Sequence, residues 1–214
     1  MSWTNFLYCY AQERGGLFLG GEDDDGALIL VEKDRPLMVN QSYESSGRSG
    51  WYTVRARTAI QLEREYTLKI GAWKGLSGGV NTLLGTLDRG LEKIPNTSGL
   101  LADYGCPEVT RKRLIRTSDR RCTRQVLQSL ELRNALLASP WDALTVQPGP
   151  GGEGFHQVEI AAGSVGWESP NGEVRLSTNW EEIRADAHER FFPRMDQLLE
   201  LVRAARDAVT VWRM

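Results

Sequence analysis

The chain has 214 residues, a formal net charge of -2, 41% hydrophobic residues and 25% charged residues, a composition typical of a globular protein. This length allows one large domain or two small ones, with a core that needs neither metal nor disulfide. The near-neutral charge excludes polyanion binding by the molecule as a whole, although a local cluster of charge could still bind an anion.

The cysteines indicate the compartment. Cys9, Cys106 and Cys122 are far apart in the sequence, and an odd number without a close pair argues against a disulfide framework or a cysteine-based metal site. The N-terminus lacks the pattern of a signal peptide, and the longest clean apolar run, 27–31, is far too short to span a membrane. We therefore expect a cytoplasmic protein with no membrane contact, no cofactor and no metal.

Residues 1–73 predict a β-rich half. The apolar runs 17–19 and 27–31 flank a loop rich in Gly and Asp, which predicts a hairpin. The acidic loop tip at 22–25 offers oxygen ligands for a hard cation such as calcium, but its spacing differs from that of an EF-hand, so we expect an exposed loop. Residues 39–50 predict a polar connector. Regular alternation of apolar and polar residues over 59–73 predicts one half-buried strand.

A Gly-Leu-Ser-Gly-Gly sequence at 75–79 matches the GxSxG nucleophile elbow. It lies between a predicted strand and a predicted helix at 80–88, as that motif requires. One hypothesis is therefore a serine hydrolase with Ser77 as the nucleophile and His156 or His188 as its base. However, hairpins rather than parallel strands with crossover helices precede the motif, so we favour Ser77 as a helix cap.

The segment 95–107 contains several Pro and Gly residues and predicts a linker or long loop. A boundary there divides the chain into a β-rich lobe at 1–95 that ends in a helix and an α+β lobe at 108–214. The two lobes could also form one compact domain.

The middle of the chain gives the clearest pattern of elements. A short strand at 114–115 runs into a helix cap at 117–119, where Thr, Ser and Asp can accept backbone hydrogen bonds. A single amphipathic helix follows and ends before Pro140. Residues 144–146 predict a second strand.

Between residues 111 and 124 there are seven basic residues and one acid. Arginine pairs with phosphate oxygens, so this cluster could bind phosphate, nucleic acid or another polyanion. The alternative is a solvated strand edge and helix face, because no aromatic residue and no nucleic-acid motif lies within the cluster. The arginines that would make the contacts are Arg111, Arg113, Arg116, Arg120, Arg121 and Arg124.

The C-terminal part predicts a hairpin, formed by residues 155–168 and 173–178, and then a helix capped by Asn179. Pro193 should kink or restart this helix. Beyond it an apolar stripe recurs at helical spacing. We expect the stripe to pack on the sheet, with a partner helix or a homodimer seam as its alternative use. The stripe consists of Met195, Leu198, Leu199, Val202, Ala205, Val209 and Trp212.

These elements predict an α+β fold: a β-rich N-terminal half followed by a β-α-β-β-β-α half, with a mainly antiparallel or mixed sheet covered by about three helices. No motif resembles a known family. The favoured function is a non-enzymatic intracellular binding or regulatory protein that acts through a protein surface, with the arginine cluster and the C-terminal helix as candidate contacts. Serine hydrolysis, and anion or nucleic-acid binding by the arginine cluster, are the alternatives.

Overall fold

The computed structural model describes residues 3–20, 26–32, 35–46, 49–72, 104–110, 113–163 and 179–211. The strands in these ranges are β1 (Leu17–Leu19), β2 (Ala27–Glu32), β3 (Arg35–Ser46), β4 (Ser49–Gln61), β5 (Leu68–Ala72), β6 (Arg113–Thr117), β7 (Ala143–Pro148) and β8 (Phe155–Gly163). The helices are α1 (Trp3–Arg14), α3 (Pro107–Thr110), α4 (Arg120–Gln128), α5 (Leu130–Ala138), α6 (Trp180–Asp186) and α7 (Phe192–Thr210), and the π-helical segment η3 (Ala187–Phe191) joins α6 to α7.

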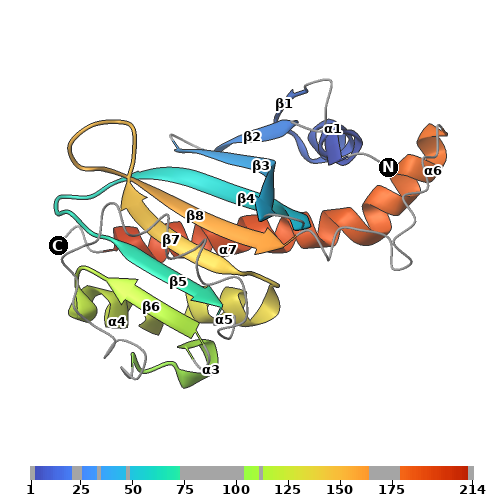
Figure 1. The fold of residues 1–214 in the computed structure, drawn as a ribbon. Helices are drawn as coiled ribbons and strands as arrows, with labels where there is room; N and C mark the ends of the chain where they lie inside the picture. Colours follow the sequence, from blue (N-terminus) through green and yellow to red (C-terminus); the bar gives the residue numbers. More distant parts are fainter. Residues whose placement is uncertain are drawn as a thin grey trace.

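The described strands form one antiparallel sheet in the order β1-β2-β3-β4-β8-β7-β5-β6 (Figure 1). The α+β class is therefore confirmed. β4, from the predicted lobe at 1–95, pairs with β8 from the predicted lobe at 108–214, and β5 of the first lobe pairs with both β6 and β7 of the second. Strands of the two predicted lobes therefore lie side by side in the same sheet. No helix in the described ranges has the length and apolar character needed to cross a membrane.

Helix α7 covers one face of the sheet and runs behind β4 and β8 (Figure 1). Alternate positions of these strands, among them Val54 and Ile160, point toward it and are fully buried. The prediction that the apolar stripe packs on the sheet is confirmed, because its described members are buried. These described members are therefore part of the core and offer no exposed seam to a partner. Trp212 lies outside the described residues.

Helix α1 was not anticipated from the sequence. Its aromatic residues recur at helical spacing and meet Phe191 of η3, with ring centroids 5.4 Å away for Trp3, 4.6 Å for Phe6 and 6.5 Å for Tyr10. The Tyr10 hydroxyl also donates a hydrogen bond to Asp196 of α7 over 2.6 Å. The N-terminal segment is thus held by the last third of the chain.

Two predictions about the strands are wrong. Residues 39–50, predicted as a connector, lie mostly in the long β3–β4 hairpin, because pairing with a neighbouring strand outweighs the weak strand propensity of polar residues such as Asn, Gln and Ser. The single strand predicted over 59–73 is two strands, and residues 62–67 connect them. The alternation continued across this connection by coincidence. The hairpin predicted from 17–19 and 27–31 is confirmed by the pairing of β1 with β2.

The helix caps lie where the sequence predicts them, with one exception. Asp119 accepts a hydrogen bond from the Cys122 amide over 2.9 Å, and Asn179 accepts one from the Glu181 amide over 3.0 Å. The helix predicted after Asp119 is, however, divided at Ser129, which caps the end of α4 and the start of α5. Serine competes for backbone hydrogen bonds and favours such caps. Of the hairpin predicted near the C-terminus, residues 164–178 lie outside the described residues.

Pro193 occupies the first turn of α7, immediately after η3. A new α-helix thus begins beside Pro193, in agreement with the prediction that this residue kinks or restarts the helix. A proline lacks the amide hydrogen that the preceding turn would need, and the first turn of a helix tolerates this loss.

Glu32 of β2 connects the sheet to α7. It accepts hydrogen bonds from Arg203 over 2.6 Å and from Arg206 over 3.3 Å. Burial alone would raise the pKa of Glu32, but the hydrogen bonds and charges of the two arginines outweigh it and lower this pKa.

Replacing Glu32 with glutamine should therefore lower the free energy of unfolding at neutral pH, by up to about 1 kcal/mol because the pair is partly exposed. The pKa of Glu32 is lower in the folded chain than in the unfolded chain. Its contribution is therefore present above the unfolded-state value and is lost as the pH falls through the folded-state value. Urea unfolding of both proteins at neutral pH and near pH 3 (~1 unit below the carboxyl range) measures this. An equal difference in the free energy of unfolding between the two proteins at both pH values would contradict this expectation.

Candidate binding face

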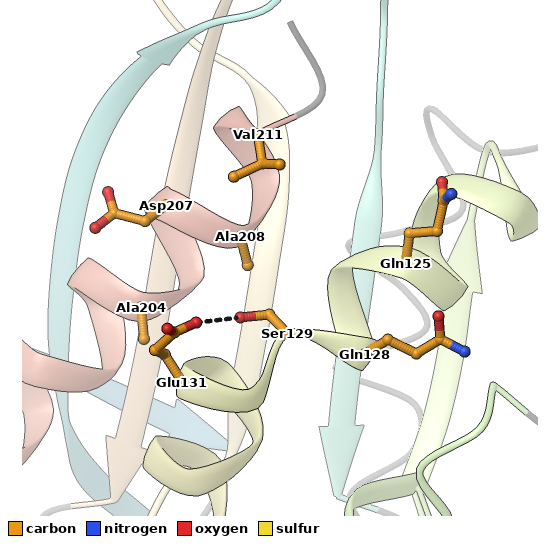
Figure 2. Close-up of a pocket in the computed structure, with 8 residues that line it drawn as sticks. All are labelled: Gln125, Gln128, Ser129, Glu131, Ala204, Asp207, Ala208 and Val211. Carbon is orange, nitrogen blue, oxygen red and sulfur yellow. Dashed lines mark hydrogen bonds between the residues drawn. The ribbon is translucent and has the colours of Figure 1, made fainter. Parts of the chain in front are cut away.

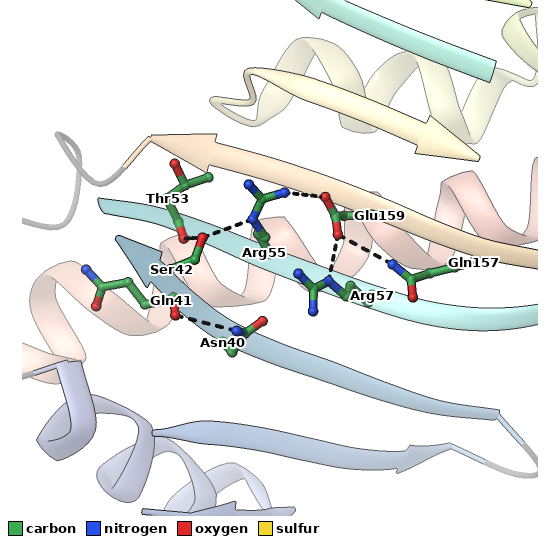
Figure 3. A network of polar contacts seen from close by, with 8 residues as sticks. All are labelled: Asn40, Gln41, Ser42, Thr53, Arg55, Arg57, Gln157 and Glu159. Atoms are coloured by element: carbon green, nitrogen blue, oxygen red, sulfur yellow. Dashed lines mark hydrogen bonds and ion pairs between the residues drawn. The ribbon is translucent and has the colours of Figure 1, made fainter. Parts of the chain in front are cut away.

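The sheet face that points away from α7 carries a row of polar and charged side chains (Figure 3). Polar and apolar residues alternate in β4 and β8, so Arg55, Arg57, Gln157 and Glu159 point to this face while Val54, Ala56, Val158 and Ile160 point to the core. We call the side chains of Asn40, Ser42, Arg55, Arg57, Gln157 and Glu159 the polar face.

Strand register aligns this face across the whole sheet. Directly paired residues share a face, and one row of pairs crosses all eight described strands. From β1 to β6 in sheet order, the row consists of Leu17, Ile29, Met38, Arg57, Glu159, Thr145, Lys69 and Arg116. The row is apolar at its β1 end and basic at its β6 end.

Glu159 lies at the centre of the polar face. One of its carboxylate oxygens accepts a hydrogen bond from Nη1 of Arg55 over 2.6 Å, and the other accepts one from Nε of Arg57 over 2.6 Å. Nε of Arg55 also donates to the hydroxyl of Ser42 over 3.0 Å. The Glu159 side chain is only 12% exposed, so these charged hydrogen bonds are shielded from water and are stronger than surface pairs.

Basic residues outnumber acidic ones on the polar face and along the row that crosses it. Arg55 and Arg57 share the carboxylate of Glu159, and Lys69 and Arg116 lie in the same row. Nη1 and Nη2 of Arg57 form no hydrogen bond with any residue that the structure describes. A carboxylate can bind two nitrogens of one guanidinium side by side. The arrangement therefore suits recognition of an acidic group.

The structure places the described members of the predicted arginine cluster on two elements, β6 and α4. Arg113 and Arg116 are three residues apart on β6 and so point to opposite faces of the sheet. Arg113 is half-buried, with its guanidinium carbon 3.5 Å from the centre of the Trp141 ring. Burial lowers its pKa, which the charge of Asp142 opposes.

The remaining arginines of the predicted cluster divide in the same way. Arg120, Arg121 and Arg124 are exposed on α4, whereas Arg111 lies outside the described residues. Only Arg116 takes part in the row across the sheet. The sequence cluster therefore separates into a stacked arginine, a residue of the sheet face and a helix surface.

The two histidines have structural partners. His156 is fully buried, its Nε2 accepts a hydrogen bond from the Tyr66 amide over 3.2 Å, and its Nδ1 lies 3.1 Å from the Gly154 carbonyl. Nδ1 must therefore carry the proton, so the ring is neutral. Glu65 lies 3.6 Å from Nε2 but is well exposed, and it makes no ion pair with a ring in this state.

His188 is exposed and pairs with Glu13 of α1 over 2.6 Å. Ser77 lies outside the described residues, so the geometry of the predicted hydrolase site is not defined. For His156 to act as its base, one of its two backbone hydrogen bonds would have to break.

A pocket of about 750 Å³ lies where α4 and α5 approach the end of α7 (Figure 2). Its carboxylates already have partners: Glu131 accepts a hydrogen bond from Ser129 over 3.2 Å, and Asp207 pairs with Arg206 over 2.8 Å. The serine hydroxyl is neutral, so the pocket keeps the negative charge of Glu131 and has no basic residue among the lining residues that the structure describes. It is lined by Gln125, Gln128, Ser129, Glu131, Ala204, Asp207, Ala208 and Val211.

The acidic loop tip at 22–25, considered above for calcium, lies outside the described residues. Comparison of the chain with family models, with curated proteins and with solved structures finds no match.

Proposed function

We propose that this chain is a non-enzymatic binding protein that holds an acidic partner protein on the polar face. The observation that carries the proposal is the binding of Arg57 to Glu159 through Nε alone, since its two terminal nitrogens form no hydrogen bond with any residue that the structure describes. A half-buried guanidinium that is already oriented by one carboxylate loses little freedom when it binds a second.

The neighbouring residues support a protein partner rather than a free anion. Ile29 and Met38 are half-buried and continue the same row toward β1. Arginine and methionine beside apolar area are typical of protein interfaces. An acidic protein segment could place a carboxylate on Arg57 while its apolar side chains cover Met38.

A fluorescent oligo-glutamate peptide is a suitable first probe. We expect it to bind the chain with an affinity that falls as salt is added. Arg57→Gln should weaken binding about tenfold, the effect of losing one charge-assisted pair. Arg57→Lys should weaken it less, because it keeps the charge and loses only the paired nitrogens. Fluorescence anisotropy at two ionic strengths measures these effects.

The matched control is Arg121→Gln on α4, which removes the same charge from an exposed position. This variant should bind like the unchanged chain. A strong loss in this control, with none in Arg57→Gln, would assign binding to the arginine cluster and so favour the anion or nucleic-acid hypothesis. No binding at low salt would refute the proposal. Thermal unfolding of Arg57→Gln checks that the chain remains folded when Glu159 loses one of its two arginine partners.

A further inference from the structure

The pocket beside the end of α7 has the size of a small-ligand site. Its volume of about 750 Å³ lies within the range of ligand pockets, about 300–1,000 Å³. Apart from Asp207, the residues that line it from α7 and its C-cap are apolar: Ala204, Ala208 and Val211. Figure 2 shows α4 across the pocket from this apolar wall. The aliphatic part of a ligand can therefore lie along the end of α7.

Glu131 gives the pocket its negative charge. Its carboxylate accepts a hydrogen bond from the uncharged Ser129 hydroxyl, and it makes no ion pair with a residue that the structure describes. Asp207 differs, because its two oxygens bind the guanidinium of Arg206 over 2.8 and 3.4 Å. A cation that enters the pocket therefore meets one carboxylate that no basic side chain has neutralised.

The ends of two helices add to this negative charge. Gln125 and Gln128 belong to the last turn of α4, and Asp207 and Ala208 belong to the last turn of α7. The last carbonyl groups of a helix lack partners within the helix and carry a partial negative charge, which favours cations. Neither of these last turns contains a basic residue. Glu131 lies in the first turn of α5, whose partial positive charge offsets only one of the two helix ends.

We propose that this pocket binds an aliphatic amine, with the ammonium group paired to Glu131 and the methylene chain along Ala204, Ala208 and Val211. An ammonium group has three N–H donors and no acceptor, which suits a carboxylate beside helix carbonyl groups. An anion would be repelled by these same groups, and a neutral molecule would gain only the apolar contact. This site is separate from the polar face, and the inference does not rest on the proposed function.

The arginines of α4 do not take the place of the ligand. Arg121 and Arg124 lie one turn before Gln125 and Gln128 and are not among the described lining residues. Side chains of a helix incline toward its N-terminus, so these two arginines extend away from the last turn of α4. Their charges act on the pocket only through solvent, where salt screens them.

Titration of the isotope-labelled chain with hexylamine or with 1-hexanol, followed by its amide shifts, tests the proposal. The two ligands have the same alkyl chain and differ in charge. Hexylamine should bind about tenfold more tightly than hexanol, the effect of one charge-assisted pair. The largest shifts should lie in α7 around Ala208 and in α5 around Glu131. Equal affinity for the two ligands, or no binding of hexylamine, would overturn the proposal.

Two variants separate the charge of the pocket from its shape. Glu131→Gln keeps the size of an exposed side chain and removes its charge, so it should weaken hexylamine binding about tenfold and leave hexanol binding unchanged. Ala204→Leu fills the apolar wall and should weaken the binding of both ligands, with thermal unfolding as the check that the chain stays folded.

The matched control is Glu181→Gln on α6, which removes the same charge from an exposed position outside the pocket. This variant should bind hexylamine like the unchanged chain. An equal loss of hexylamine affinity in Glu181→Gln and Glu131→Gln would show attraction to the net charge of the molecule and would overturn the proposal. Unchanged hexylamine affinity in Glu131→Gln would overturn it as well.

Discussion

Replacing Phe191 with alanine should lower the free energy of unfolding by about 3–5 kcal/mol, the usual cost of removing a buried aromatic ring. Phe191 is 2% exposed and lies in η3, between α6 and α7. Its ring stacks on Phe6 and meets Trp3 and Tyr10 edge-on. Alanine would leave a cavity between α1 and the C-terminal helices, and it would remove aromatic contacts that add to simple burial.

Urea unfolding gives this free energy, and limited proteolysis shows whether α1 detaches first. Leu130→Ala is the matched control, because Leu130 is 66% exposed at the start of α5. This control should change stability by less than about 0.5 kcal/mol. A cost below about 1 kcal/mol for Phe191→Ala would show that α1 does not depend on this cluster.

Replacing His156 with alanine should lower the free energy of unfolding by about 2–5 kcal/mol, because the buried Tyr66 amide loses its acceptor and the lost ring leaves a cavity. The Gly154 carbonyl would lose the contact with the ring but keep its hydrogen bond from the Leu62 amide over 2.8 Å. The Tyr66 amide cannot turn to water without opening the connection between β4 and β5. His156 thus joins this connection to the turn before β8.

His156→Gln should cost less than alanine, because the glutamine amide can replace one of the two hydrogen bonds. His188→Ala is the control from the exposed histidine and should cost less than about 1 kcal/mol, the value of an exposed ion pair. Equal stability of the two alanine variants in urea unfolding would contradict the structural role of His156.

Local patterns predicted the local features of this fold. Asp119 and Asn179 cap helices because the side-chain oxygen of a short polar residue before a helix can accept a hydrogen bond from an amide of the first turn. The stripe on α7 follows from apolar residues at helical spacing, and the β1–β2 hairpin follows from two apolar runs around a glycine-rich loop. Each of these signals lies within about twenty residues of sequence and needs no knowledge of distant contacts.

The candidate binding face could not be predicted, because it depends on pairing between distant strands. Arg55 and Glu159 are 104 positions apart in the sequence. Alternation in the sequence does predict that Arg55 and Arg57 lie on one face of a strand. Nothing local shows that β8, rather than a sequence neighbour, lies beside them. The same limit applies to α1, whose aromatic side chains are explained only by their contact with Phe191.

The predicted arginine cluster shows that residues close together in the sequence can lie on different elements of the fold. Proximity in the sequence suggested one site, but Arg113 and Arg116 point to opposite faces of the sheet, and Arg120, Arg121 and Arg124 lie on α4. Density of charge along a chain is therefore a weaker guide than its position on a sheet.

Backbone amide shifts of the isotope-labelled chain, recorded while the oligo-glutamate peptide is added, would locate the bound acidic segment residue by residue. If the polar face is the binding site, the largest changes will occur along β3, β4 and β8 around Arg57 and Glu159, and in Arg57→Gln they will require about tenfold more peptide. Changes confined to α4, or no changes at low salt, would contradict binding at the polar face.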